Sequence, residues 1–327
     1  MSNIPMELFE AEVTGTERLS RDFVRIRLAS EQLTRLAAPA GDGSGQVLDS
    51  YLKLFIPHPE LSGPVRLDLN DTWRKDWFAA DPKERGGWIR TYTLRDSRAW
   101  TSPAGGKGVE IDVDFVLHPP EGKSEGGDQP PEMGPGATWA SRAKVGDSLS
   151  FIGPSREGQL WSMWKPEQAD TVIVCADETA VPAAMSVLRT LPQGARARFL
   201  LEVPEGNAEL DRHAQPLIEE ARRHGDLELH WLERREGMVR GKLTLQALRE
   251  ALGIEPHDED ADSPLGVKVA ADEIVWKTTE HPGSTYVYLA GEASVVRAAR
   301  RVCVNEANIE KSSISFMGYW KAGHAES

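Results

Sequence analysis

Apolar residues occupy every second position in several short stretches of the first half of the chain. Such alternation is typical of strands that bury one face. These stretches are Phe23–Leu28, Tyr51–Ile56 and Ile111–Leu117, and three further strands between turns are expected at Glu7–Thr14, Ile89–Arg95 and Ser148–Ile152. About six strands of this kind predict a small antiparallel β-barrel. Gly63–Gly87 and Pro119–Gly136 are rich in Gly, Pro and charge, which predicts surface excursions, the first partly helical around Trp73–Phe78.

The second half has a different pattern. Thr171–Ala176 is a short continuous apolar run, typical of a strand covered on both faces. Helical and extended segments then alternate: helices are expected at Pro182–Leu191, Glu209–His224, Leu243–Leu252 and Ser294–Asn308, and strands at Ala197–Val203, Leu227–Leu232, Tyr286–Ala290 and Ile314–Tyr319. This order predicts an open parallel sheet with right-handed crossovers. Ile254–Gly283 is expected to be an insertion.

The boundary between the two patterns lies near Gly158–Ala169, where Gly and Pro flank two tryptophans. The chain has 327 residues, enough for two domains that each bury a core. We therefore expect a β-barrel domain over residues 1–160 and an α/β domain over residues 168–327.

Charge and cysteine content narrow the classes of partner. The formal net charge of -13 argues against nucleic acid or an anionic membrane. No apolar run approaches the roughly 20 residues of a membrane span, and the first residues lack a secretory pattern. Cys175 and Cys303 have neither CxxC spacing nor neighbouring histidines, so no zinc or iron–sulfur site is expected. The expectation is a cytoplasmic monomer without stable membrane insertion.

Arg90–Arg95 places a cation, an aromatic ring and hydroxyls on one extended segment. An arginine can pair bidentately with pyrophosphate oxygens, a tyrosine ring can cover an isoalloxazine, and a nearby hydroxyl can bond its edge. These groups suit a flavin nucleotide. An exposed strand of mixed polarity has the same pattern, so the segment by itself leaves both readings open.

Two further places suit phosphate. Gly134–Ala140 introduces a short helix whose free N–H groups would face an anion, with Thr138 able to add a hydroxyl. Thr171–Ala176 leads directly into the turn Asp177–Pro182, and Gly291–Ser294 repeats this arrangement after a later strand. There is no GxGxxG fingerprint, and ordinary strand–helix connections fit these segments equally well.

Taken together, these segments resemble the siderophore-interacting protein family of flavin-dependent ferric-siderophore reductases, in the ferredoxin-reductase-like superfamily. The matching segments are Tyr51–Pro57, Arg90–Arg95, Asp112–His118, Gly134–Ala140, Ala176–Pro182, Leu289–Ser294 and Gly318–Gly323. They occur in family order from near residue 10 to the C-terminus.

The resemblance implies that the barrel binds FAD and that the sheet presents NADH or NADPH at its carboxyl edge. The implied flavin contacts are Arg90, Thr91, Tyr92 and Thr93, with His118, Ala137, Thr138 and Trp139 on the nucleotide side and Trp320 near the ring. Asp177, Glu178, Thr179, Gly291 and Glu292 would frame the NAD(P)H groove. The sequence departs from the family pattern at Ala137, usually serine, and at Ala176, often glycine.

The implied activity is reduction of Fe(III) in a siderophore, with FAD accepting hydride from NAD(P)H and passing on single electrons. No side chain is expected to ligate iron or to act as a catalytic group. Lys53, with Arg297 and Lys321, is expected to meet the anionic ferric chelate. A general flavin or ferric-chelate reductase and a non-catalytic siderophore-binding carrier remain alternatives. Acids precede the single arginine in Pro204–Arg212, which favours NADH, and the siderophore class stays open.

Overall fold

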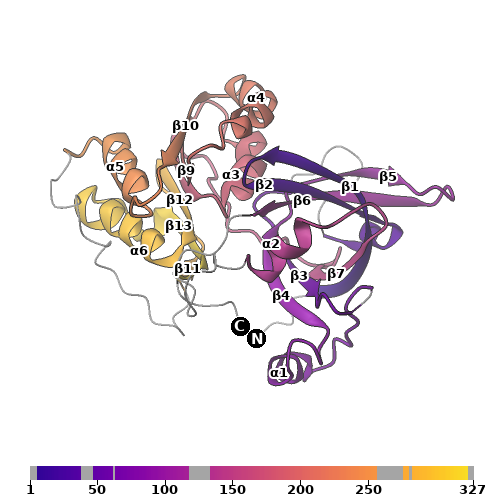
Figure 1. The fold of residues 1–327 in the computed structure, drawn as a ribbon. Helices are drawn as coiled ribbons and strands as arrows, with labels where there is room; N and C mark the ends of the chain where they lie inside the picture. The colour runs from indigo at the N-terminus through magenta and orange to yellow at the C-terminus, as the bar shows by residue number, and fades with distance from the viewer. Residues whose placement is uncertain are drawn as a thin grey trace. The chain divides into compact units, whose positions relative to one another are not determined.

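The computed structural model describes residues 6–37, 47–61, 63–117, 133–255, 275–279 and 282–322. The chain divides into two compact units, one built from residues up to Ser162 and the other from Met163 onward (Figure 1).

The first unit is a seven-stranded antiparallel sheet. Its strands are β1 (Met6–Ser20), β2 (Phe23–Ser30), β3 (Tyr51–Pro57), β4 (Gly87–Thr93), β5 (Asp96–Thr101), β6 (Lys107–Val116) and β7 (Ser148–Pro154). They are ordered β4-β3-β7-β1-β2-β6-β5. The sheet curls around its own core, so that the Tyr92 ring on β4 lies 4.2 Å from the Phe115 ring on β6. The predicted antiparallel barrel is confirmed.

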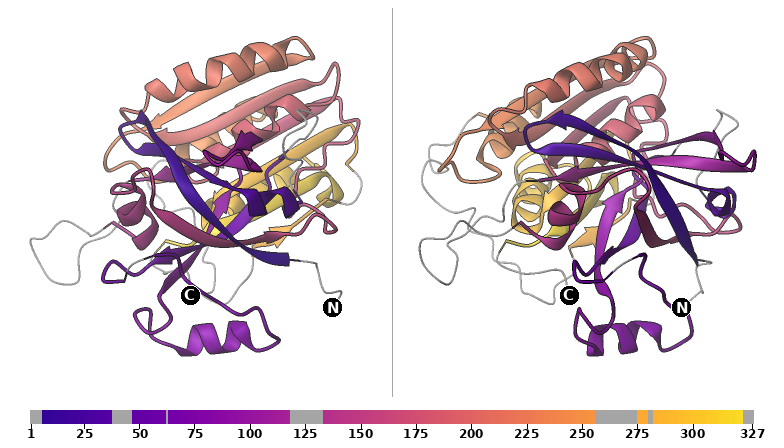
Figure 2. Two further views of the ribbon diagram at one scale, coloured as in Figure 1. Left: turned by 90° about the vertical axis from the view of Figure 1, so that its right-hand side faces the viewer. Right: turned by 45° about the vertical axis from the view of Figure 1, so that its right-hand side comes forward.

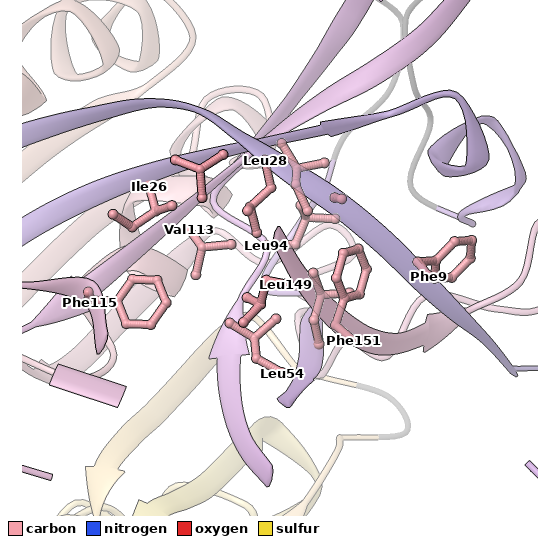
Figure 3. Packing of buried hydrophobic residues seen from close by; sticks show 14 of the residues in the cluster. Phe9, Ile26, Leu28, Leu54, Leu94, Val113, Phe115, Leu149 and Phe151 are labelled. Carbon is pink, nitrogen blue, oxygen red and sulfur yellow. The ribbon is translucent and has the colours of Figure 1, made fainter. Parts of the chain in front are cut away.

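The alternating apolar positions build this core. Phe9 of β1, Ile26 of β2, Leu54 of β3, Phe115 of β6 and Phe151 of β7 are all fully buried and point into one interior (Figure 3). Burial of one such side chain contributes roughly 2 kcal/mol, so the period-two pattern by itself determines which face of each strand turns inward.

One strand of the first unit was not predicted. β5 consists of polar and half-exposed residues and lacks an apolar face, so it has no periodicity to recognise. Its backbone is held by antiparallel pairing to β6. The strand predicted over Ile89–Arg95 lies two residues earlier, because β4 begins at Gly87 and ends at Thr93. The amide of Arg95 donates to the carbonyl of Asp112 on β6.

The segment predicted as a surface excursion, Gly63–Gly87, is partly buried. It contains the expected helix, α1 (Trp73–Ala79), but Trp73 and Trp77 pack with Phe55 and Ile152 in a second small core. Phe55 alternates with the inward-facing Leu54 and Ile56, so this second core covers the outer face of β3 and β7. The prediction that this segment lies at the surface was therefore wrong for these two tryptophans. Of the other excursion, Pro119–Gly136, residues 119–132 lie outside the described residues.

The second unit contains a mostly parallel sheet. Its strands are β8 (Thr171–Asp177), β9 (Arg196–Pro204), β10 (Asp226–Arg234), β11 (Trp276–Lys277), β12 (Thr285–Glu292) and β13 (Ile314–Trp320). They are ordered β10-β9-β8-β12-β13-β11, with β11 antiparallel at the edge. The predicted parallel sheet is confirmed. Of the expected insertion Ile254–Gly283, residues 256–274, 280 and 281 lie outside the described part of the chain.

Helices cover both faces of this sheet. Figure 1 shows α5 (Lys242–Ala251) and α6 (Ala293–Arg301) on one side and α3 (Val181–Val187) and α4 (Glu209–Arg222) on the other. Figure 2 shows α4 running alongside β10. α6 continues into a π-helical turn, Val302–Glu306. Within the residues that the structure describes, no helix is both long and apolar enough to span a bilayer.

Both cysteines lie in the core beneath α5 and α6, Cys175 on β8 and Cys303 in the π-helical turn. Burial raises the pKa of Cys303 to about 12 and raises the pKa of Cys175 well above its ordinary value. Thiols react as thiolates, so both should be inert in the folded protein.

We expect the native protein to resist a disulfide-exchange reagent such as DTNB at pH 8, and to release both thiols to it after unfolding in guanidinium chloride. Absorbance of the released thiolate counts the reacted groups, and added free cysteine calibrates the reagent. Rapid reaction of either thiol in the native protein would contradict the assignment.

Candidate functional site

The β4 segment divides its chemistry between two faces. Residues directly opposite each other on paired strands share a face. Arg90 and Tyr92 stand opposite Leu54 and Leu52, on the side of the barrel core. Thr91 and Thr93 stand opposite Lys53 and Tyr51, on the outer side. One short strand therefore presents a cation and a ring on one face and hydroxyls on the other.

Tyr92 joins β4 to α2 (Pro135–Ala140). Its ring packs on Phe115, whose own ring lies 5.6 Å from that of Trp139 on α2. Gly136 is buried at this contact, and a Cβ there would lie 2.1 Å from Tyr92 Oη. Glycine is thus required for the tyrosine hydroxyl to approach the helix backbone.

The side chains of α2 serve mainly the core. Ala137, at the position where a serine was expected, packs in the barrel interior with Ala140. The Thr138 hydroxyl donates to the carbonyl of Met133 at 3.0 Å. Gly134 caps the start of the helix without a side-chain hydrogen bond, so the polar groups offered there belong to the main chain. His118 lies outside the described residues.

Positive charge gathers at the beginning of β4. Arg90 is half-buried and donates to the carbonyl of Ile89 at 2.7 Å. Burial lowers the pKa of Arg85, and repulsion from Arg90 lowers it further. Two guanidinium groups near enough to repel each other create a local cationic region in a strongly acidic chain.

On the outer face of the β3–β4 pair, some polar groups are hydrogen-bonded and others are not. Lys53 Nζ lies 2.5 Å from Thr91 Oγ1 and 5.9 Å from the centre of the Tyr51 ring. Thr93 Oγ1 and the neighbouring Ser50 Oγ are buried, with no hydrogen-bond partner among the described residues. Buried hydroxyls in folded proteins are normally bonded, so these two favour a polar ligand group close by. Ser50 was missed from sequence because a lone serine before a strand carries no pattern.

The second unit concentrates its charged groups at one point of the sheet. From β8 the chain adds β9 and β10 on one side of the sheet and then β12 and β13 on the other, so the winding of the sheet changes side between β8 and β12. Ligands of open parallel sheets bind outside the carboxyl ends of the strands at such a switch point. Asp177 ends β8, Glu292 ends β12 and Trp320 ends β13. The topology therefore brings together three of the residues singled out from sequence.

Asp177 is the centre of this arrangement. Its Oδ1 accepts from the amide and hydroxyl of Thr179, and its Oδ2 accepts from the amide of Glu292 at 2.8 Å and from Trp320 Nε1 at 2.9 Å. Burial and the adjacent Glu178 raise the pKa of Asp177, against the opposing effects of Arg240 and of these hydrogen bonds.

Gly291 makes room for that carboxylate. Its φ is +142°, a conformation that favours glycine, and a Cβ would lie 2.6 Å from Asp177 Cγ. Glu292 caps α6 by accepting from the amides of Ser294 and Val295. The side chains of Asp177 and Glu292, which were expected to frame a groove, thus hold the ends of neighbouring strands and the start of α6 together.

Glu178 is completely buried and paired with two arginines that sequence reasoning missed. Both of its oxygens lie 2.6 Å from Arg240 Nη1, and Oε1 lies 3.3 Å from Arg234 Nη2. Arg234 also reaches Glu202, which accepts from the amides of Gly241 and Thr244. A signal for Glu202 was available, because it interrupts the apolar strand Phe199–Val203. Arg234 and Arg240 lie at the two ends of the polar loop between β10 and α5, where no periodic pattern pointed to them.

The remaining predicted cations belong to different units. Lys53 belongs to the first unit, whereas Arg297 and Lys321, both half-buried, belong to the second. In the part of the chain that the structure describes, no group of three or more His, Cys, Asp or Glu side chains could hold a metal ion.

Each of the two units matches one protein-family model. Residues 12–158 match a family model described as the siderophore-interacting FAD-binding domain, and residues 169–323 match one described as siderophore-interacting protein. The ferric vibriobactin reductase ViuB of Vibrio cholerae is 27% identical over 309 residues, covering 93% of this chain and 90% of the relative.

Solved structures share the fold. A siderophore utilization protein from T. fusca superposes with a TM-score of 0.59 at 23% identity, over 98% of this chain and 95% of that one. A ferredoxin reductase of carbazole 1,9a-dioxygenase gives a TM-score of 0.51 at 14% identity, over 98% of this chain and 71% of the other. The ferredoxin-reductase-like fold predicted from sequence is confirmed.

The close contact between Tyr92 and Gly136 predicts that a side chain at position 136 destabilises the protein. Gly136→Ala should lower the free energy of unfolding by roughly 1–3 kcal/mol, because the added methyl group collides with Tyr92 Oη. Chemical denaturation measures the change. Gly134→Ala is the matched control, since no atom lies within 4 Å of a Cβ there, and it should change stability by less than about 0.5 kcal/mol.

A second substitution tests the cause. In a Tyr92→Phe background the clashing oxygen is absent, and the nearest remaining atom, Cζ, would lie 3.2 Å from the new Cβ. Gly136→Ala should then cost much less than in the native background. An equal cost in both backgrounds would show that the hydroxyl contact is not the reason for glycine.

Proposed function

The chain belongs to the siderophore-interacting protein family, and we propose that it is an FAD-dependent NAD(P)H oxidoreductase that reduces ferric siderophores. The observation that carries this proposal is the division of the chain, in which a barrel matching an FAD-binding domain precedes a parallel sheet with a polar switch point. The relative named a ferric vibriobactin reductase supports the same activity.

The groups of the first unit fit FAD. Arg90 would pair with the pyrophosphate, with Arg85 adding to the local positive potential. Tyr92, fixed between Phe115 and Gly136, would give the isoalloxazine a rigid aromatic surface. The unbonded hydroxyls of Thr93 and Ser50 would hydrogen-bond polar atoms of the cofactor, with Thr91 beside them. We extend the proposal to His118 and to Ala137, Thr138 and Trp139 around α2 on the nucleotide side.

Bound FAD would accept a hydride from the nicotinamide and deliver single electrons to the metal. The protein's part is to hold the ring, exclude water from its buried face and supply hydrogen bonds at fixed positions. Ferric iron is held by anionic oxygen donors far more strongly than ferrous iron, so reduction makes the metal releasable. We propose that iron stays within its chelator and takes no ligand from the protein.

The second unit would bind the pyridine nucleotide at the carboxyl edge of its sheet. Asp177, Glu178, Thr179, Gly291 and Glu292 would form the base of the groove. Trp320, expected near the flavin ring from the resemblance, would also cover part of this groove. We propose NADH as the preferred donor. The residues that follow β9 include the exposed acids Glu205 and Glu209, and Asp211 follows in the first turn of α4. These carboxylates would repel the 2′-phosphate of NADPH.

The ferric chelate requires local positive charge because the protein is strongly acidic. Lys53 is proposed as one contact, since its ammonium group lies on the outer face beside Thr91. Arg297 and Lys321 are proposed as further contacts from the second unit. We also propose that the protein works as a cytoplasmic monomer.

The decisive experiment is anaerobic stopped-flow reduction of the purified, FAD-loaded protein. NADH should bleach the visible flavin band, and NADPH should need roughly tenfold more nucleotide for the same rate, as expected for about 1.4 kcal/mol of unfavourable interaction. Catecholate, hydroxamate and simple ferric complexes are then mixed with the reduced protein. Equal rates with all three would favour the general ferric-chelate reductase, and failure to bind FAD would favour the carrier.

Arg90 provides a mutational test. Arg90→Ala should lose FAD on dilution while the protein stays folded, because a guanidinium–pyrophosphate pair contributes roughly 1.5–3 kcal/mol. Flavin fluorescence after gel filtration measures retention, and far-UV circular dichroism reports the fold. Arg27→Ala is the control, since Arg27 lies on β2 and pairs with Glu17. Equal FAD retention in both variants would remove Arg90 from the site.

A further inference from the structure

Trp320 is held at the carboxyl edge of the second sheet by two contacts of different kinds. Its indole Nε1 donates to Asp177 Oδ2 at 2.9 Å, and the guanidinium carbon of Arg240 lies 4.7 Å from the ring centre. The hydrogen bond fixes the edge of the ring, and the cation covers one of its faces. The main chain beyond it is held too, because the amide of Ala322 donates to Glu292 Oε1 at 3.2 Å.

Arg240 is itself fixed by burial and charge. It comes from the loop between β10 and α5, is 9% exposed, and places one nitrogen 2.6 Å from both oxygens of the fully buried Glu178. A planar guanidinium can pair with a carboxylate and stack on an indole at the same time, which a lysine ammonium cannot do equally well. Arg240 therefore links the buried carboxylate cluster to the aromatic ring.

Arg234 provides an internal comparison. It is buried to a similar degree and also pairs with Glu178, at 3.3 Å, and it pairs with Glu202 at 3.1 Å. The cation that lies over the Trp320 ring is Arg240. The two arginines thus share a carboxylate, and Arg240 differs in lying over the ring and 4.0 Å from Asp177.

We propose that Arg240 is a positioning residue that acts through Trp320. Together with Asp177 it clamps the indole at the switch point, so that the ring presents a fixed aromatic surface to the nicotinamide. This proposal rests on the proposed function, because it takes NAD(P)H to bind at this edge. It adds a residue, and a route of action, that the family resemblance does not supply.

The clamp is tested first without flavin or nucleotide. Tryptophan labelled with ¹⁵N gives indole N–H signals from the ten tryptophans of the chain, and Trp320→Phe identifies the one of interest. In Arg240→Lys that signal should shift and its hydrogen exchange should accelerate about tenfold, because the cation no longer covers the ring while a charge still faces Glu178. Arg234→Lys, the matched control, should leave the signal and its exchange rate nearly unchanged.

The consequence for the reaction is tested in the FAD-loaded protein by anaerobic stopped flow. Arg240→Lys should raise the NADH concentration for half-maximal flavin reduction about fivefold, with a smaller change in the limiting rate. In a Trp320→Leu background the same substitution should change that concentration by less than about twofold, because its route of action has been removed. Arg240→Gln is the second variant if Arg240→Lys folds poorly.

Three results would overturn the clamp: an unaltered indole signal in Arg240→Lys, the same response from Arg234→Lys, or an undiminished effect of Arg240→Lys in the Trp320→Leu background. Failure of the proposed function looks different. The native flavin would then remain oxidised with either nucleotide, whatever the indole signal does.

Discussion

A single carboxylate joins the ends of three parallel strands in the second unit. Asp177, at the end of β8, accepts hydrogen bonds from the first residue beyond Gly291 on β12 and from the side chain that ends β13. Its position requires a glycine with φ of +142° on the neighbouring strand and leaves no room for a methyl group there. The edge at which the sheet can receive a nucleotide is therefore shaped by this buried acid, and the placement of Glu292 and Trp320 follows from it.

Buried acids outnumber buried bases around that point. Four carboxylates, those of Asp177, Glu178, Glu202 and Glu292, share the region with the guanidinium groups of Arg234 and Arg240. Main-chain amides at the starts of α5 and α6 supply the remaining stabilisation, since Glu202 and Glu292 accept hydrogen bonds from them. A carboxylate at the start of a helix also interacts favourably with the helix dipole. Main-chain amides and the two guanidinium groups therefore both offset the negative charge of the cluster.

Periodicity was sufficient to predict both architectures, because apolar alternation fixes the inward face of a barrel strand and continuous apolar runs mark the doubly covered strands of a parallel sheet. It could not reveal β5, which is defined by backbone pairing, or the burial of Trp73 and Trp77 on the outside of the barrel. The family resemblance, whose implied cofactor-binding roles stay predictions, is the source from which Arg90–Thr93, Asp177–Thr179 and Gly291–Glu292 were named as candidates. Arg234, Arg240 and Ser50 were not, because their roles arise from contacts between segments far apart in sequence.

The second core of the barrel has a consequence for how the molecule opens. Phe55 and Ile152 face α1 on the outside of β3 and β7, while Leu54 and Phe151 on the same strands face the interior. These two strands are thus sandwiched between apolar layers, whereas most of the edge strand β5 is half-exposed. Amide protons of β3 and β7 should be among the last to exchange with deuterated solvent, so β3, the strand paired with β4, belongs to the most slowly opening part of its unit.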